Sequence, residues 1–194
     1  MKKKKKKNFP ITVINPDPRD FDFADIDGIR KKITKKKNQI HDSVTISQVL
    51  ENGVWSLETQ FNEQGQCQAV GIVENSYNIP ACADLAQAPY NMHVAFFTGH
   101  AWSSGKIYCK GTQTPGNAIY IKNQFVKAEY NSDKGTLIFF INGVQQPVYI
   151  SGIKEKVRFF IFMFHAGATC VIHSMKKLAD PTSGHVANEK AVQW

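Results

Sequence analysis

The sequence has few cysteines, and their spacing gives them no recognisable chemical role. Cys67, Cys82, Cys109 and Cys170 form no C-x-x-C pair, which excludes zinc-ribbon and thioredoxin-like sites. No apolar run follows the leading lysines, so a secretory signal is also lacking. Because disulfides persist only in oxidising compartments, we expect free thiols in an intracellular protein of the cytoplasm or nucleus.

Long apolar runs and catalytic motifs are lacking as well. The most apolar stretch, Val157–Phe164, contains Arg158 and is too short to cross a membrane. No G-x-S-x-G, H-E-x-x-H, P-loop or kinase motif occurs. His165 and Cys170 come nearest to a nucleophile–base pair, but a small thiol in an apolar strand is usually buried. We therefore expect a protein that is not an enzyme and that needs no cofactor or metal.

The net charge of +8 is confined to the start of the chain. Residues 1–37 contain 13 Lys and Arg residues against five Asp, whereas residues 38–194 contain 11 of each sign. The balanced remainder argues against a nucleic-acid groove on the folded part. Nucleic acid or chromatin would therefore be bound only through Lys2–Lys7 and the second basic cluster, residues 30–37. That second cluster is equally consistent with a lysine-rich edge strand or loop.

Alternating apolar and polar residues predict an all-β protein. Val126, Ala128 and Tyr130 share one face of an extended segment, with Lys127 and Glu129 on the solvent face. An apolar strand over residues 136–141 ends at Asn142-Gly143, a strong hairpin signal, because both residues tolerate positive φ. Return strands over residues 148–150 and 157–164 complete a predicted antiparallel meander.

The first half of the chain carries further strands. Trp55, Leu57, Thr59 and Phe61 share a face that we expect to be buried, and a polar turn over residues 63–68 leads to a partner strand. Phe21 and Phe23 indicate an edge-like strand. The segment 74–89 lacks periodicity apart from a possible helical turn over 81–88; such long loops often carry recognition, although a passive surface loop is the alternative.

Several of these motifs, in order, resemble the SPRY domain family. They are Gly53-Val-Trp55-Ser-Leu-Glu58, Ala69-Val-Gly71-Ile-Val73, Trp102 to Tyr108, and the G-T-L-x-F-F-x-N-G run from Gly135 to Gly143. The resemblance spans roughly residues 21–178. It implies a two-sheet antiparallel β-sandwich of the concanavalin-like jelly-roll type. We expect this domain over residues 19–180, with a flexible basic tail over 1–18 and a departing tail over 181–194.

The resemblance also implies a function, which is protein recognition by loops at one rim of a monomeric sandwich. Carried onto this sequence, the loops are residues 74–79, 99–104 and 164–167. Ala166 stands where several members have a Trp, which puts the usual peptide preference in doubt. A carbohydrate-binding sandwich is a further alternative. The predicted partner-binding residues are Asn75, Ser76, Tyr77, Asn78, His100, Trp102, His165 and Ala166.

Overall fold

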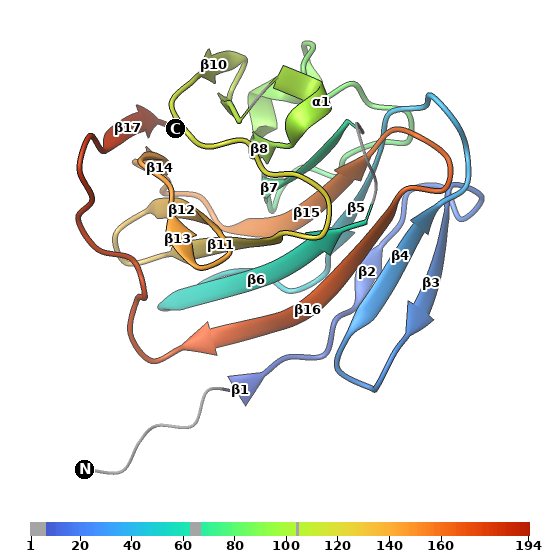
Figure 1. Ribbon diagram of the computed structural model, residues 1–194, viewed down its shortest axis with the longest axis horizontal. Coiled ribbons are helices and arrows are strands. Elements are labelled where there is room, and N and C mark those ends of the chain that lie inside the picture. Colours follow the sequence, from blue (N-terminus) through green and yellow to red (C-terminus); the bar gives the residue numbers. More distant parts are fainter. Residues whose placement is uncertain (1–6, 63–66, 104) are drawn as a thin grey trace.

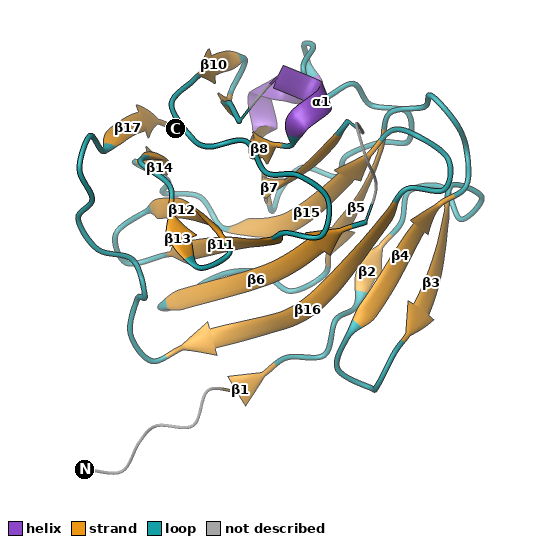
Figure 2. Ribbon diagram, viewed as in Figure 1, coloured by secondary structure: helices purple, strands orange, loops and turns teal. Residues whose placement is uncertain are grey.

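The computed structural model describes residues 7–62, 67–103 and 105–194 and shows two β-sheets packed face to face (Figure 1; Figure 2). The all-β sandwich predicted from the sequence is confirmed. The turn predicted at 63–68 and the leading lysines Lys2–Lys6 fall largely outside the described residues.

Sheet A is the larger sheet, and most of its neighbouring strands are antiparallel. Two short strands join it beside this main path: β1 (Lys7–Asn8) on β16 and β13 (Val144–Gln145) on β12. In spatial order the path contains β17 (Lys190–Gln193), β14 (Val148–Ser151), β12 (Thr136–Ile141), β11 (Phe125–Asn131), β6 (Val54–Phe61), β16 (Thr169–Leu178), β4 (Lys31–Lys35) and β3 (Phe21–Asp25).

Sheet B faces sheet A across the core. Two short helical elements flank it: a 3₁₀ turn, η1 (Tyr90–His93), before β8, and α1 (His100–Ser103) after it. In spatial order this sheet contains β10 (Thr112–Thr114), β9 (Ile107–Cys109), β8 (Val94–Thr98), β7 (Gln68–Glu74), β15 (Val157–Met163), β5 (Asp42–Ile46) and β2 (Val13–Ile14).

The main core fills the space between the sheets and follows the predicted alternation. Trp55 is 3% exposed, and Val126, Ala128 and Tyr130 are all buried, as predicted. The Asn142-Gly143 hairpin is confirmed, since both residues take positive φ, 48° and 81°, between β12 and β13. Apolar burial on this scale is the main stabilising contribution in a sandwich.

Three details of the predicted strands are wrong. The meander does not continue into β15, which crosses to sheet B and pairs with β7 and β5. The basic strand β4 lies between β16 and β3, so β3 rather than β4 forms the edge. The helical turn expected over residues 81–88 is absent from that described segment, which forms irregular turns.

The two predicted tails carry strands in this structure. Within residues 1–18, β1 pairs with β16 and β2 pairs with β5. At the other end, β17 pairs in parallel with β14, and Trp194 donates its indole N–H to Glu155 at 2.7 Å. Glu129, expected to face solvent, is only 2% exposed because residues 182–183 cover it. Residues 181–194 thus run along sheet A in this structure (Figure 1).

Candidate functional site

The outer face of sheet B, away from the main core, carries a second apolar cluster. Phe96 and Tyr108 stack with ring centroids 4.8 Å apart, and Phe160 packs edge-on against Phe96 at 6.0 Å. The irregular segment 75–93 covers these rings with Ile79, Ala83 and Leu85. The segment 75–93, much of which was predicted as a loop from its lack of periodicity, is therefore packed against sheet B by its own apolar side chains.

Arg158, in β15, fixes the start of this covering segment. Its Nη2 donates to the carbonyl oxygens of Asn75 and Tyr77, at 3.2 and 3.0 Å, and to Asn78 Oδ1 at 3.0 Å. Burial lowers the pKa of Arg158 below its ordinary value. These are charge-assisted hydrogen bonds, which are stronger than neutral ones. Segment 75–78 consequently has a defined conformation, with Ser76 exposed at its turn.

Replacing Arg158 by Met should free segment 75–78 while leaving the strands in place. The methionine keeps the apolar stem but removes the donors to Asn75, Tyr77 and Asn78. We expect amide hydrogen exchange over residues 75–79 to rise by about tenfold or more, since losing one charged hydrogen bond costs about 1.5–3 kcal/mol. The matched control is Lys106→Met, which removes a half-buried lysine whose hydrogen bond to Gln113 is exposed. Equal exchange in both variants would contradict the role given to Arg158.

Tyr77 lies in a polar cluster at this end of sheet B. Its ring stacks on His93 with centroids 4.0 Å apart, and His93 Nδ1 lies 2.9 Å from Glu74 Oε2. Lys110 donates to the other carboxylate oxygen of Glu74 at 2.7 Å. Burial alone would raise the pKa of Glu74, but the hydrogen bonds from Lys110 and His93 hold it below its ordinary value. This cluster fixes the orientation of the Tyr77 ring.

Trp102 packs on the rings of the outer apolar cluster, with its centroid 5.1 Å from that of Phe96 and 5.7 Å from that of Tyr108. It is half-buried, with its centroid 4.4 Å from that of Phe162, and Phe162 lies 5.7 Å from His41. His41 contacts Phe164 at 4.7 Å, and Phe164 in turn contacts His165 at 4.8 Å. We call the four half-buried side chains His41, Trp102, Phe164 and His165 the rim cluster. Half-buried rings of this kind present apolar surface to a partner while they still shield the core from water.

The strand register separates the two groups. Glu74 of β7 pairs with Val157, and Gln68 at the other end of β7 pairs with Met163. The two ends of β7 are about 20 Å apart at the rise of an extended strand. The structure therefore divides the predicted site: Asn75, Ser76, Tyr77 and Asn78 lie at one end of sheet B, and His100, Trp102, His165 and Ala166 at the other.

Three loops that surround the rim cluster are joined by hydrogen bonds. The amide of Ala166 donates to Asn38 Oδ1 at 3.2 Å, and that of Cys82 donates to Asp42 Oδ1 at 3.1 Å. His41 Nδ1 lies 3.4 Å from Asp84 Oδ1. His41 was missed in the sequence because it stands in no periodic pattern, whereas Phe164 fell within the predicted loop 164–167 but was not named as a binding residue. Their proximity to Trp102 depends on the order of β8, β7, β15 and β5 within one sheet.

The thiols do not form part of this site's chemistry. All four cysteines are free, as predicted, and Cys170 is buried in the main core. Burial raises the pKa of Cys170 far above its ordinary value and that of Cys109 to about 11. Within the described parts of the chain, no three His, Cys, Asp or Glu side chains are grouped to hold a metal ion. No helix in those parts is long and apolar enough to span a membrane.

Comparison with known proteins finds similarity only at the level of structure. No protein-family model and no curated protein sequence matches the chain. Among solved structures, the SPRY domain of human HERC1 matches with a TM-score of 0.60 at 12% identity, covering 85% of this chain and 99% of that one. The TRIM65 PSpry domain matches with a TM-score of 0.62 at 11% identity, covering 86% and 89%. The chain has the SPRY fold.

A third structure extends this comparison. Stonustoxin matches with a TM-score of 0.54 at 15% identity, covering 80% of this chain but only 28% of its own. A SPRY fold can therefore be one part of a longer protein. In the present SPRY fold the glycine of the A-V-G-I-V motif, Gly71, lies directly beside Phe96 of β8. Because it has no side chain, the glycine of this motif leaves room for Phe96, a member of the outer apolar cluster.

Proposed function

We propose that this chain is a protein-recognition module that binds a peptide or protein surface at the rim cluster. The SPRY fold is typically a protein-interaction module. The observation that carries the proposal is the run of rings from Trp102 to His165 at one end of sheet B, bordered by three hydrogen-bonded loops. Aromatic side chains in such settings concentrate binding energy at interfaces.

The surroundings of the rim cluster favour a partner with an apolar side chain flanked by polar groups. Ala166 leaves open space beside His165, since its exposed side chain is only a methyl group. Arg19 is 81% exposed and is held by Asp17, which also lies 3.2 Å from Lys37. A short peptide could place an apolar residue against Trp102 and Phe164. Its polar backbone would then lie along the charged residues Asp17, Arg19 and Lys37.

Replacing Trp102 by Ala should weaken such binding by about 30-fold or more. Truncation of one true anchor typically costs about 2 kcal/mol. Peptides selected from a displayed library on the immobilised full chain supply the probe, and calorimetry measures its affinity for each variant. Tyr77→Ala is the matched control, because Tyr77 is also half-buried against the same apolar cluster but at the opposite end of sheet B.

The outcome distinguishes the two ends of sheet B. Affinity lost in the Trp102 variant and retained within twofold in the Tyr77 variant supports the rim cluster. The reverse result would move the site to segment 75–78. Melting curves of both variants show whether either change acts through folding. A role as an adaptor or substrate reader inside the cell follows from this proposal and is tested only once a partner is known.

A further inference from the structure

The segment 179–189, which we call the strap, crosses the outer face of sheet A between β16 and β17 (Figure 1). The side chains of sheet A beneath it bind its backbone and the side-chain hydroxyl of Thr182. Glu129 Oε1 accepts the amide N–H groups of Thr182 and Ser183 at 3.0 and 2.9 Å. The other oxygen, Oε2, accepts the hydroxyl of Thr182 and lies 3.3 Å from Lys127 Nζ.

Gln145 continues this recognition one residue further along the strap. Its amide nitrogen donates to the carbonyl oxygen of Gly184 at 2.7 Å, and its oxygen accepts the N–H of Gly184 at 2.9 Å. Three consecutive residues, 182–184, are therefore held by three side chains of sheet A: Glu129, Gln145 and Lys127, whose Nζ donates to Thr182 Oγ1. Side chains that satisfy both the donor and the acceptor of a backbone are the means by which proteins bind extended peptides.

The charge of Glu129 suits this role. The side chain is 1% exposed, and its neighbours supply several donors. Burial alone would raise the pKa of Glu129, but the hydrogen bonds from Thr182 and Ser183, with the charge of Lys127, hold it below its ordinary value. A buried carboxylate is stable only when its oxygens are paired in this way. Whatever occupies this place must therefore bring N–H and O–H donors.

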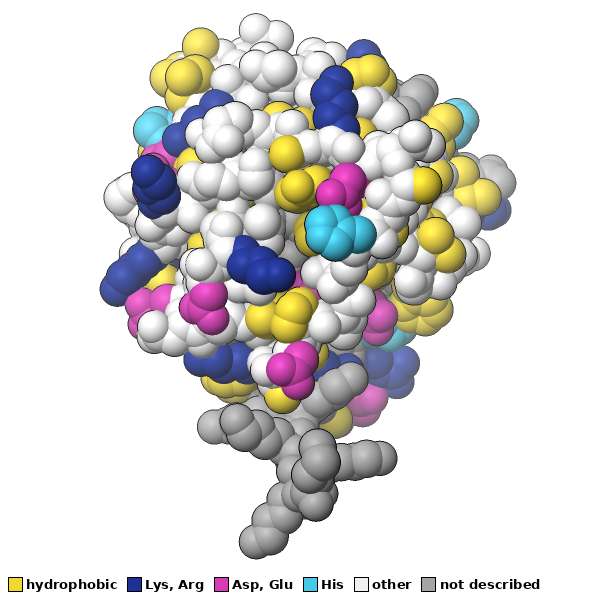
Figure 3. Space-filling model, turned by 90° about the vertical axis from the view of Figure 1, so that its left-hand side faces the viewer, with side chains coloured by type: hydrophobic (Ala, Val, Ile, Leu, Met, Phe, Trp, Pro, Cys, Tyr) yellow, Lys and Arg dark blue, Asp and Glu magenta, His cyan; other side chains and the backbone are white. Residues whose placement is uncertain are grey.

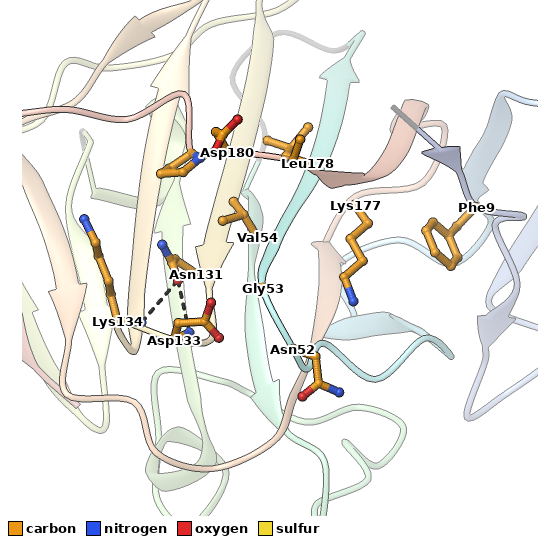
Figure 4. Close-up of a pocket in the computed structure, with 12 residues that line it drawn as sticks. Phe9, Asn52, Gly53, Val54, Asn131, Asp133, Lys134, Lys177, Leu178 and Asp180 are labelled. Carbon is orange, nitrogen blue, oxygen red and sulfur yellow. Dashed lines mark hydrogen bonds between the residues drawn. The ribbon is translucent and has the colours of Figure 1, made fainter. Parts of the chain in front are cut away.

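The strap does not fill the face that it crosses. A hollow of about 620 Å³ lies at its beginning, between Leu178–Pro181 and the side chains of Val54, Asn131 and Lys134 (Figure 4). A second, of about 180 Å³, lies beside Ser183–His185. A third, of about 190 Å³, borders Thr182 and Lys127. In the space-filling view of the left-hand side of Figure 1, charged and apolar side chains are interspersed (Figure 3).

We propose that the outer face of sheet A around Glu129 and Gln145 is a second peptide-binding groove, occupied in cis by residues 181–184 and open in trans to an extended peptide of the same chemistry. That peptide carries a Ser or Thr at the position of Thr182 and a non-proline residue at each of the next two positions, whose N–H groups reach Glu129 and Gln145. An acidic residue at the first position is excluded by the Glu129 carboxylate. The hollows beside the strap leave room for flanking side chains larger than those of the strap.

The test weakens the strap and leaves the groove intact. In the full chain, Thr182→Pro with Ser183→Pro removes the two N–H donors and the hydroxyl that reach Glu129. The probe is a labelled synthetic peptide of residues 178–189, and fluorescence anisotropy measures its affinity. We expect the double variant to bind the probe at least tenfold more tightly than the unchanged chain, in which the strap competes.

Three controls make the result specific to the groove. Adding Glu129→Gln to the double variant replaces two acceptor oxygens by one and an amide donor, so the gain in affinity should disappear. A probe carrying the same two prolines should not bind. Trp102→Ala should leave the affinity unchanged, because the rim cluster belongs to sheet B, and this separates the groove from the proposed rim site.

Several results would overturn the proposal. They are a folded double variant that does not bind the probe, binding that survives Glu129→Gln, and binding that occurs only through exchange of straps in a dimer, seen by size-exclusion chromatography. If the double variant does not fold, the unchanged chain serves instead. Excess probe should then raise amide exchange at residues 182–184 at least threefold, and unchanged exchange there rejects a groove that is open in trans.

Discussion

Replacing Asp42 by Ala should lower the free energy of unfolding by about 3–5 kcal/mol, the usual cost of leaving one partner of a buried ion pair alone. The Lys35 side chain is 0% exposed and Asp42 is 1% exposed, and Lys35 Nζ forms its ion pair with Asp42 Oδ2. The other oxygen of Asp42 accepts the amide of Cys82. Without the carboxylate, the Lys35 ammonium group would keep only the ring of Phe21, 5.2 Å away, to offset its lost hydration.

Two further variants test this explanation by chemical denaturation. Asp22→Ala removes the partner of Lys36, an ion pair between β3 and the residue that follows β4, whose side chains are 69% and 44% exposed. Its effect should stay below about 1 kcal/mol, because solvent screens exposed pairs. Lys35→Met combined with Asp42→Leu should recover most of the loss, since it removes both buried charges. A double variant as unstable as Asp42→Ala alone would show that the loss comes from packing.

Replacing Gly71 by Ala should destabilise the domain by about 3 kcal/mol, near the upper end for an overfilled core. A methyl group at Gly71 would lie 2.2 Å from the carbonyl oxygen of Ala95 and 2.5 Å from Phe96 Cβ. Both contacts belong to β8, whose position is fixed by its pairing with β7 and β9. β7 cannot move away from β8 without breaking its hydrogen bonds to β15, and β8 cannot move away from β7 without breaking its hydrogen bonds to β9.

The control for this substitution is Gly184→Ala. Nothing lies within 4 Å of a methyl group at Gly184, so its stability should change by less than about 0.5 kcal/mol. Thermal and denaturant unfolding of both variants compare the two glycines directly. If Gly71→Ala is as stable as Gly184→Ala, then β7 and β8 can separate more easily than their contacts indicate.

The strands and their faces could be predicted from the sequence because their signals are local. The alternation from Trp55 to Phe61 and the Asn142-Gly143 turn depend on neighbouring residues alone, and the structure confirms both. The order of SPRY-like motifs supplied the architecture. Which sheet each strand joins is not a local property, so β15 was assigned to the wrong sheet.

Burial of charged side chains could not be predicted, because it depends on distant segments. Glu129 alternates with apolar residues as a solvent-facing residue would, and only residues 182–183, more than 50 positions away, bury it. Lys35 belongs to a basic cluster that suggests an exposed strand, yet Asp42 and Phe21 enclose it. In both cases the alternation within the strand predicts the strand correctly. It carries no information about the distant segment that covers the charged side chain.

The candidate site was predicted in part. The segment that carries Tyr77 was identified by its lack of periodicity, and those that carry Trp102 and His165 by the resemblance to SPRY domains. Their placement at two ends of sheet B follows from the register of β7 and β15. His41, which connects Phe162 to Phe164, had no sequence signal because a lone histidine in a polar segment fits many roles. Which side chains lie close together in space can be inferred only once the strand order is known.

The parallel pairing of β17 with β14 determines how sheet A ends. Without β17, the backbone of β14 would offer its unpaired groups to any other extended chain, and Val148 and Ile150 are apolar. With it, the outermost strand is four residues long and begins with the exposed Lys190. A short, charged border of this kind discourages aggregation through strand pairing between molecules. The residues after the strap thus protect the solubility of the domain as well as its shape.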